Sequence, residues 1–311
     1  MMSVLVTTLR SVLANADAHL AAGRLGASRR AYEDLLERTQ ARTDRAMEVV
    51  ARSMLAQCLL RTRDVDGARD QLQSASRLLD PLHLESHARY RRSLCRLALE
   101  EGLPNTVEPE LRDYLSWAEE VRSHAEVLDA CQLLARISSP EERIDWLRRG
   151  IDHALNFEVH DTLGYAYNDL AAALDVAGSL PEAMEAYQQS LTWHEWNADR
   201  GRPGARRGVV GAGWAVGTLA NRLEEWPLAR TRLEEARKLA EEFEGAADLV
   251  GLILAELAIV YEAAGDVVEA RRLVIGALKS GREQSLESVW PERWQSLCAY
   301  ARELELDPLA T

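Results

Sequence analysis

Three arginines, Arg89, Arg92 and Arg96, follow one another at spacings of three and four residues. These spacings place their side chains on one face of a helix. A row of like charges on an acidic protein favours an anionic ligand, such as an acidic peptide segment, a C-terminal carboxylate or a phosphate. A solvated helix face explains the row as well, because Glu85 and Glu100 lie four residues from Arg89 and Arg96. Both interpretations stay open at the level of sequence.

Other candidate chemistry in the sequence is weaker. His83 and His87, in HLESH, have a spacing that can share a metal ion on a helix, but no third ligand is placed beside them. A helix that begins after Pro81 with Glu85 in its first turn accounts for both histidines. The segment HEWNA lacks the second histidine of a zincin motif, and GARRGVVGAG lacks the Lys-Ser/Thr of a phosphate-binding loop. The sequence therefore predicts no metal, no cofactor and no catalytic site.

Composition narrows the class of protein. The 311 residues are 47% hydrophobic but only 6% aromatic, which is typical of a helical chain rather than of one rich in strands. A formal net charge of -13 disfavours nucleic acid and anionic lipid as partners. No apolar run is long enough for a membrane span. Four cysteines stand singly within apolar helical pattern, which predicts buried thiols in a cytoplasmic protein. They are Cys58, Cys95, Cys131 and Cys298.

The elements that must position these residues repeat along the chain, and the clearest copy runs from Leu170 to Leu191. Its small and apolar residues fall at helical spacing on both sides of a break at Gly178, and Pro181 is a favoured first residue of a second helix. One such hairpin cannot bury its apolar face alone and needs stacked neighbours. Further copies begin near Asn15, Leu55, Val216 and Leu257.

A constant spacing links these copies. The small residue that opens the second helix lies twelve positions after a small residue in the first, as in the pairs Ala56 and Ala68, Ala171 and Ala183, and Ala258 and Ala270. Small residues at these positions let the two helices approach closely, while a bulky residue four positions later fills the gap to the next hairpin.

This pattern resembles the tetratricopeptide repeat (TPR), with a step of about 40 residues instead of the usual 34. The resemblance implies an all-α fold: a right-handed superhelical α-solenoid of about seven hairpins, forming one domain over residues 1–311. A capping helix is expected over 289–306, where Trp290 and Trp294 recur at helical spacing. Two middle hairpins, 93–114 and 128–151, match weakly, with turns expected at 102–104 and 138–140. The composition of 197–208 predicts a long connection between repeats.

In a TPR superhelix the first helix of each hairpin lines a concave groove, so the resemblance implies groove residues. The row Arg89, Arg92 and Arg96 takes such positions. Aromatic and arginine side chains often anchor interfaces, although packing between hairpins explains Trp214 equally well. The residue pattern of the family's two-carboxylate clamp is not matched in three adjacent units. The other implied groove residues are Tyr165, Asn168, Trp214, Asn221 and Arg222.

The function that the resemblance implies is a non-catalytic scaffold or adaptor that binds a partner protein or peptide, such as one with an acidic segment. The alternative is a ligand-gated sensor, in which a signal peptide or small molecule changes the pitch of the superhelix. The step of about 40 residues is similar to that of bacterial regulatory TPR proteins. Homo-oligomers through imperfect end caps are also compatible with the sequence.

Overall fold

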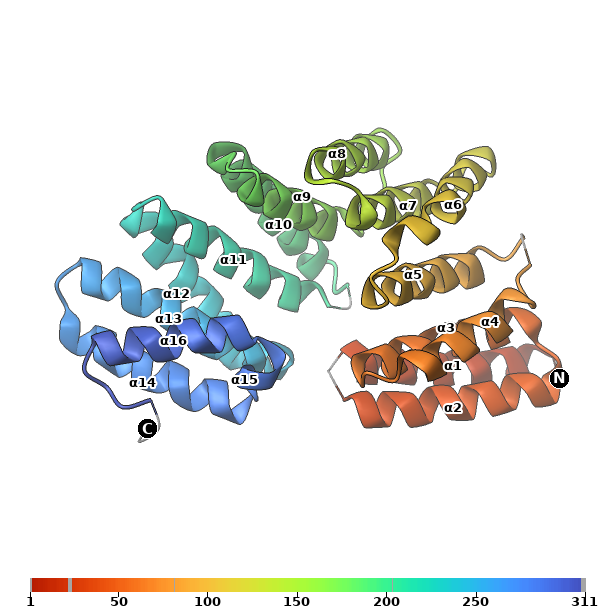
Figure 1. Cartoon of the computed structure of the whole chain (residues 1–311), viewed down its shortest axis with the longest axis horizontal. Coiled ribbons are helices and arrows are strands. Elements are labelled where there is room, and N and C mark those ends of the chain that lie inside the picture. The colour runs from red at the N-terminus through yellow and green to blue at the C-terminus, as the bar shows by residue number, and fades with distance from the viewer. Residues whose placement is uncertain (1, 22–23, 81, 203, 309–311) are drawn as a thin grey trace. The chain divides into compact units, whose positions relative to one another are not determined.

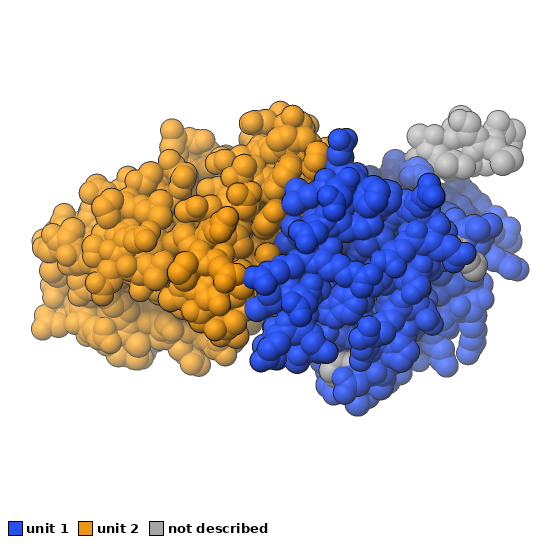
Figure 2. Space-filling model, turned by 90° about the horizontal axis from the view of Figure 1, so that it is seen from above, with its two compact units in different colours: residues 1–158 blue, residues 159–311 orange. Residues whose placement is uncertain are grey.

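The computed structural model describes residues 2–21, 24–80, 82–202 and 204–308, and all regular structure in these ranges is helical. The predicted all-α class is therefore confirmed. The described residues group into two compact units, 1–158 and 159–311, which Figure 2 distinguishes by colour. The single domain over 1–311 stays a prediction.

Unit 1 consists of four antiparallel helical hairpins, drawn from red to yellow-green in Figure 1. The hairpins are α1 (Met2–Ala21) with α2 (Leu25–Arg42), α3 (Arg45–Arg61) with α4 (Val65–Ser76), α5 (Leu84–Glu100) with α6 (Glu108–Glu120), and α7 (His124–Ile137) with α8 (Pro140–Asn156). The two helices of the first, second and fourth pairs pack against each other, whereas α5 and α6 approach each other less closely and are connected by the short helix η1 (Pro104–Thr106) and an ion pair between Arg91 and Glu110.

Unit 2 continues the pattern with three more hairpins and a helix that packs on the last of them. The seven hairpins of the described ranges agree with the number expected from the sequence. The elements are α9 (Leu163–Val176) with α10 (Leu180–Asp199), α11 (Ala205–Arg222) with α12 (Trp226–Glu242), α13 (Ala247–Ala263) with α14 (Val267–Glu283), and then α15 (Leu286–Val289) and α16 (Pro291–Glu303).

The small residues predicted to bring each pair of helices together are buried. Ala171 and Ala183 are fully inaccessible, as are the corresponding alanines of the other hairpins that fit the pattern. In the first hairpin the position twelve after Ala16 is Ser28, whose hydroxyl donates to the Ala16 carbonyl oxygen at 3.2 Å. A side chain that reaches the backbone of the facing helix requires close approach, so the bond explains why this position excludes a bulky residue.

Several predicted turns are confirmed. Gly178 ends α9 with φ of 80°, a conformation that glycine adopts without strain. The turn at 138–140 includes a capping box, in which Ser139 and Glu142 exchange side-chain and backbone hydrogen bonds at the start of α8. The sequence pattern also predicts a turn at Gly23 in the first hairpin and the end of the second hairpin at Pro81, and both residues fall outside the described residues.

The predicted long connection over 197–208 is wrong at both ends. Helix α10 continues to Asp199 and α11 begins at Ala205, so the connection is much shorter. Asn197 is buried within α10, and its amide donates to the Asp161 carbonyl oxygen at 3.2 Å. Gly208 lies inside α11, directly against the imidazole of His194. Packing between helices thus outweighs the loop-forming composition.

The predicted capping helix is present as α16, with bounds slightly inside the expected 289–306. Trp294 on α16 packs over Gly281 of α14, where an added Cβ would lie 2.9 Å from the indole ring. Leu297 and Ala301, which share the face of Trp294, are buried. The cap therefore covers the apolar face of the last hairpin.

Candidate functional site

The first helices of successive hairpins in unit 1 are fixed against one another. Helix α5 contacts both α3 and α7. The hydroxyl of Ser93 on α5 donates to the Ser53 carbonyl oxygen on α3 at 2.8 Å, and the amide of Gln57 donates to the Ser93 hydroxyl at 3.1 Å. Residues about one repeat step apart therefore lie next to each other on this face.

This face of unit 1 holds a pocket of about 340 Å³. The first helices of three successive hairpins, α1, α3 and α5, line it, and the second helices do not. The predicted groove residues Arg89 and Arg92 are part of its wall. The complete lining is Asp17, Leu20, Met54, Gln57, Arg61, Arg89 and Arg92.

Arg89 is neutralised by carboxylates of unit 1. Its guanidinium donates to both oxygens of Asp17 on α1, at 3.0 and 2.8 Å, and also lies 3.3 Å from Glu85. Tyr32 donates to the same Asp17 carboxylate at 2.5 Å. Bidentate pairs of this kind fix geometry as well as charge. Arg89 therefore joins α5 to α1, and the sequence-based pairing with Glu85 is present.

Arg92 is neutralised by a buried carboxylate on the next hairpin. Its Nε donates to Asp129 on α7 at 2.6 Å, and the Tyr114 hydroxyl lies 3.4 Å from the other oxygen of Asp129. Burial raises the pKa of Asp129 above the usual range, while the charge of Arg92 opposes the shift. Arg92 therefore ties α5 to α7.

Arg96 differs from Arg89 and Arg92 in its hydrogen bonding. Its Nε is buried and has no hydrogen-bond partner in the part of the chain that the structure describes. Glu100, four residues later, pairs instead with Arg63 at 3.6 Å. Burial lowers the pKa of Arg96, and the neighbouring charges of Arg61 on α3 and Arg136 on α7 lower it further, while the charge of Glu100 opposes the shift. We call Arg61, Arg96 and Arg136 the basic cluster.

Sequence reasoning found one member of the basic cluster and missed the other two. Arg136 lies 40 residues after Arg96, which is the repeat step, so extending the register by one repeat identifies it. Arg61 is the last residue of α3 and falls outside the three- and four-residue spacing that identified the row on α5. Among the described residues, no ion pair to a carboxylate engages any of the three guanidiniums.

The predicted groove residues of unit 2 mostly connect helices. Arg222 on α11 pairs with Asp175 on α9 at 2.6 Å. Asn221 is buried, and its amide donates to both the carbonyl oxygen and the carboxylate of Glu256 on α13, at 3.0 and 2.9 Å. These two side chains bridge three successive first helices, so each is engaged within the unit.

The remaining predicted residues of unit 2 lie on α9 and α11. Tyr165 is 49% exposed and meets the ring of His194 edge-on, with centroids 4.6 Å apart. Asn168 is half-buried on the same helix. Trp214 is half-buried on α11 and lines a second pocket, of about 300 Å³, together with α13 and α16. Trp214 therefore lies at a cavity of unit 2.

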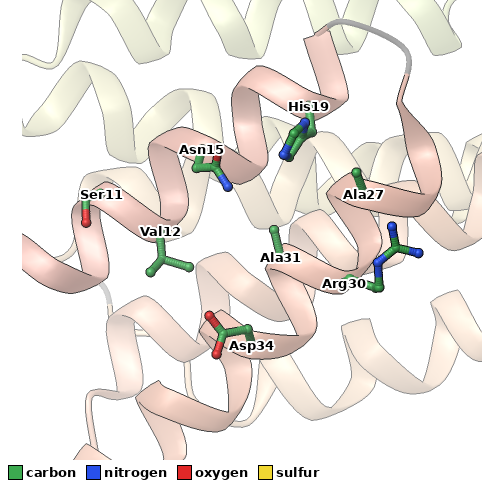
Figure 3. A pocket seen from close by; sticks show the side chains of 8 residues that line it. All are labelled: Ser11, Val12, Asn15, His19, Ala27, Arg30, Ala31 and Asp34. Carbon is green, nitrogen blue, oxygen red and sulfur yellow. The ribbon is translucent and has the colours of Figure 1, made fainter.

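A third pocket, of about 490 Å³, lies between α1 and α2 (Figure 3). Asn15 and His19 from α1 and Arg30, Ala31 and Asp34 from α2 are among the residues that line it. Because a single hairpin lines this pocket, it lacks the contribution from successive repeats that the other two pockets have.

Three further observations describe the chemistry of the chain. Within the described ranges, no three or more His, Cys, Asp or Glu side chains gather as a metal site. No described helix is both long enough and apolar enough to span a membrane. Cys95 and Cys131 are buried free thiols, and burial raises the pKa of each to about 11, which makes them poor nucleophiles.

No protein-family model and no curated protein sequence matches this chain. Solved structures do. A Signal Transduction ATPase with Numerous Domains (STAND) protein with a tetratricopeptide repeat sensor, from Pyrococcus horikoshii, aligns with 91% of this chain at a TM-score of 0.59 and 14% identity. This chain spans only 43% of the length of that protein.

Two further structures cover most of their own length. A Rap protein complexed with Competence and Sporulation Factor aligns with 98% of this chain and 88% of its own, at a TM-score of 0.58 and 11% identity. NprR in complex with its cognate peptide NprX aligns with 95% of this chain and 84% of its own length, at a TM-score of 0.51 and 12% identity. At these identities the similarity concerns the fold. Together with the buried repeat pattern, it shows that the chain is a helical repeat protein of the tetratricopeptide type.

Proposed function

We propose that this chain is a non-catalytic cytoplasmic scaffold that binds a partner protein or peptide on the first helices of its hairpins. We further propose that the basic cluster of unit 1 holds an acidic segment of that partner. The observation that carries the proposal is the buried, unpartnered Nε of Arg96, flanked by Arg61 and Arg136. Its neighbours Arg89 and Arg92 each have a carboxylate partner.

The physical argument is one of charge compensation. A partly buried cation with no carboxylate in ion-pair contact, beside two like charges, is unfavourable even though Glu100 lies near enough to offset part of the repulsion. A carboxylate bound between the guanidiniums would satisfy the Arg96 donor and reduce the repulsion. Arginine suits this role because its planar fork of N–H groups matches the two oxygens of a carboxylate. The free thiols are compatible with a reducing compartment.

Two of the similar structures are complexes, that of Rap with Competence and Sporulation Factor and that of NprR with its cognate peptide NprX. They support peptide binding as a use of this fold but say nothing of the ligand of this chain. A ligand-gated sensor is the second candidate. The pocket at Trp214 favours it, because that pocket is large enough for a small ligand or one side chain.

The basic cluster is expected to determine affinity for acidic peptides. Replacing Arg61, Arg96 and Arg136 together with glutamine should weaken binding of a fluorescent hexaglutamate peptide at least tenfold, because each charge-assisted hydrogen bond contributes roughly 1.5–3 kcal/mol. Fluorescence anisotropy at constant ionic strength measures the affinity. Binding of hexaglutamine should be weak in every variant.

A matched control separates the site from overall charge. Arg38, Arg112 and Arg149 lie on the second helices α2, α6 and α8, and all are substantially exposed. Their triple glutamine variant has the same net charge and should bind hexaglutamate nearly as well as wild type. Equal weakening of both triple variants, or no preference of wild type for hexaglutamate over hexaglutamine, would contradict the proposed site.

A further inference from the structure

The pocket of unit 2 that includes Trp214 has mainly apolar walls. It lies between α13 and α16, with Trp214 of α11 on a third side. Leu252 and Ile259 of α13 and Leu297 of α16 are among the residues that line it, and Ile259 is the most exposed of the three. Its volume of about 300 Å³ is at the lower end of the range for small-molecule pockets, which suits one large side chain rather than a cofactor.

The charges at this pocket are balanced, unlike those of the basic cluster. Glu256 accepts a hydrogen bond from Asn221 at 2.9 Å and lies 3.8 Å from Arg293 of α16. Tyr300, also in the wall, donates a hydrogen bond from its hydroxyl group to the Glu262 carboxylate at 2.7 Å. Glu256 would repel the terminal carboxylate of a peptide in the pocket, and Arg293 would repel a terminal ammonium group. The charges therefore favour a neutral group.

The polar groups with unused capacity at the pocket are donors. The Nε1 of Trp214 is buried and has no partner among the residues that the structure describes. Arg293 approaches Glu256 only to 3.8 Å, beyond hydrogen-bond length, and its guanidinium lies 5.5 Å from the centroid of the Trp214 ring. A carbonyl oxygen is the neutral acceptor that such donors suit.

We propose that this pocket binds a neutral apolar residue from the interior of a peptide chain. The apolar side chain packs against Leu252, Ile259 and Leu297, and a main-chain carbonyl accepts from Arg293. This inference rests on the proposed function as a peptide-binding scaffold, and it adds a second anchor that recognises an apolar residue where the basic cluster recognises acidic ones.

The test uses the full chain and two peptides that differ at one residue, acetyl-Gly-Ser-Leu-Ser-Gly-amide and the same peptide with serine in place of leucine. NMR titration should show the leucine peptide binding at least tenfold more tightly, because burying one leucine side chain contributes about 1.5–3 kcal/mol, which is tenfold or more in affinity. Equal affinity for the two peptides would overturn the proposal.

Two variants with matched controls locate the binding. Ala255→Phe fills the pocket and should remove the preference for leucine, while Ala263→Phe, on an exposed position of the same helix, should keep it. Ile259→Ser removes part of the pocket wall and should lower the affinity for the leucine peptide at least fivefold. Ile275→Ser, at a similarly exposed isoleucine on α14, should not. Unchanged preference in both pocket variants would overturn the proposal.

Hexaglutamate distinguishes failure of this inference from failure of the proposed function. The Arg61, Arg96 and Arg136 triple variant should keep its preference for the leucine peptide, and Ala255→Phe should keep its affinity for hexaglutamate. If hexaglutamate binds as expected but the leucine peptide binds no more tightly than the serine peptide, only the apolar anchor is refuted. If neither peptide binds wild type, the scaffold proposal fails together with this inference.

Discussion

Lowering the pH from about 6.5 to about 4 is expected to destabilise unit 2 through His194. The imidazole is 3% exposed and packs against Gly164 of α9 and Gly208 of α11, while Tyr165 meets it edge-on. Burial lowers the pKa of His194 to about 4, and no ionised neighbour contributes to the shift. The folded unit therefore holds this histidine in its neutral form.

The sign of the effect follows from proton linkage. Below pH 6.5 the unfolded chain takes up a proton on His194 that the folded unit does not, so stability is full above 6.5 and falls until about pH 4. A shift of this size corresponds to about 3 kcal/mol at most. Urea unfolding of the full chain, followed by circular dichroism at several pH values, should show this loss.

Two variants control the experiment. His194→Asn should lower stability at neutral pH but flatten its dependence on pH between 6.5 and 4. His160→Gln changes a half-buried histidine beside Trp193 and should leave the slope as in wild type. An NMR titration that finds His194 protonating near pH 6.5 in the folded chain would contradict the account.

The second large effect concerns the contact between Gly217 on α11 and Leu233 on α12. Leu233 is fully buried, and a Cβ at Gly217 would overlap its side chain. Leu233→Ala should lower the free energy of unfolding by about 2–5 kcal/mol. Gly217→Ala should lower it by about 1–3 kcal/mol through overpacking, less the helix propensity that alanine gains.

The double variant tests whether the two residues interlock. The methyl group that Gly217→Ala introduces can occupy the space that Leu233 vacates, so the double variant should lose at least about 1 kcal/mol less than the two single losses combined. Gly211→Ala is the control, because nothing lies within 4 Å of a Cβ there, and it should be neutral or stabilising. Strict additivity in urea denaturation would mean that the small residue is not required by this contact.

Much of the fold follows from local sequence because each hairpin mostly contacts its neighbours along the chain. The positions twelve apart, such as Ala171 and Ala183, predicted buried interfaces that the structure confirms. The prediction of a long connection over 197–208 is wrong because Gly208 serves helix packing, whereas Gly201 and Gly204 do form the short turn, with positive φ. Gly208 leaves room for His194, which comes from a different helix, and composition alone carries no record of that contact.

The candidate site was predictable only in part. Helical spacing placed Arg89, Arg92 and Arg96 on one face, but it could not determine which of them has a carboxylate partner. The partners of the first two are Asp17 and Asp129, which lie 72 and 37 residues away in the chain. Local charge patterning suggested a pair between Arg96 and Glu100 that does not form. Selecting among the three arginines therefore needed tertiary structure.

The most direct test of the central claim locates a bound acidic peptide on the chain. A hexaglutamate peptide with a benzophenone photo-crosslinker can be irradiated with the full chain and the attachment points identified by mass spectrometry. The account predicts attachment to α3, α5 and α7 near the basic cluster, with loss of crosslinking in the Arg61, Arg96 and Arg136 glutamine variant. Attachment mainly to the second helices α4, α6 and α8, or to unit 2, would contradict it.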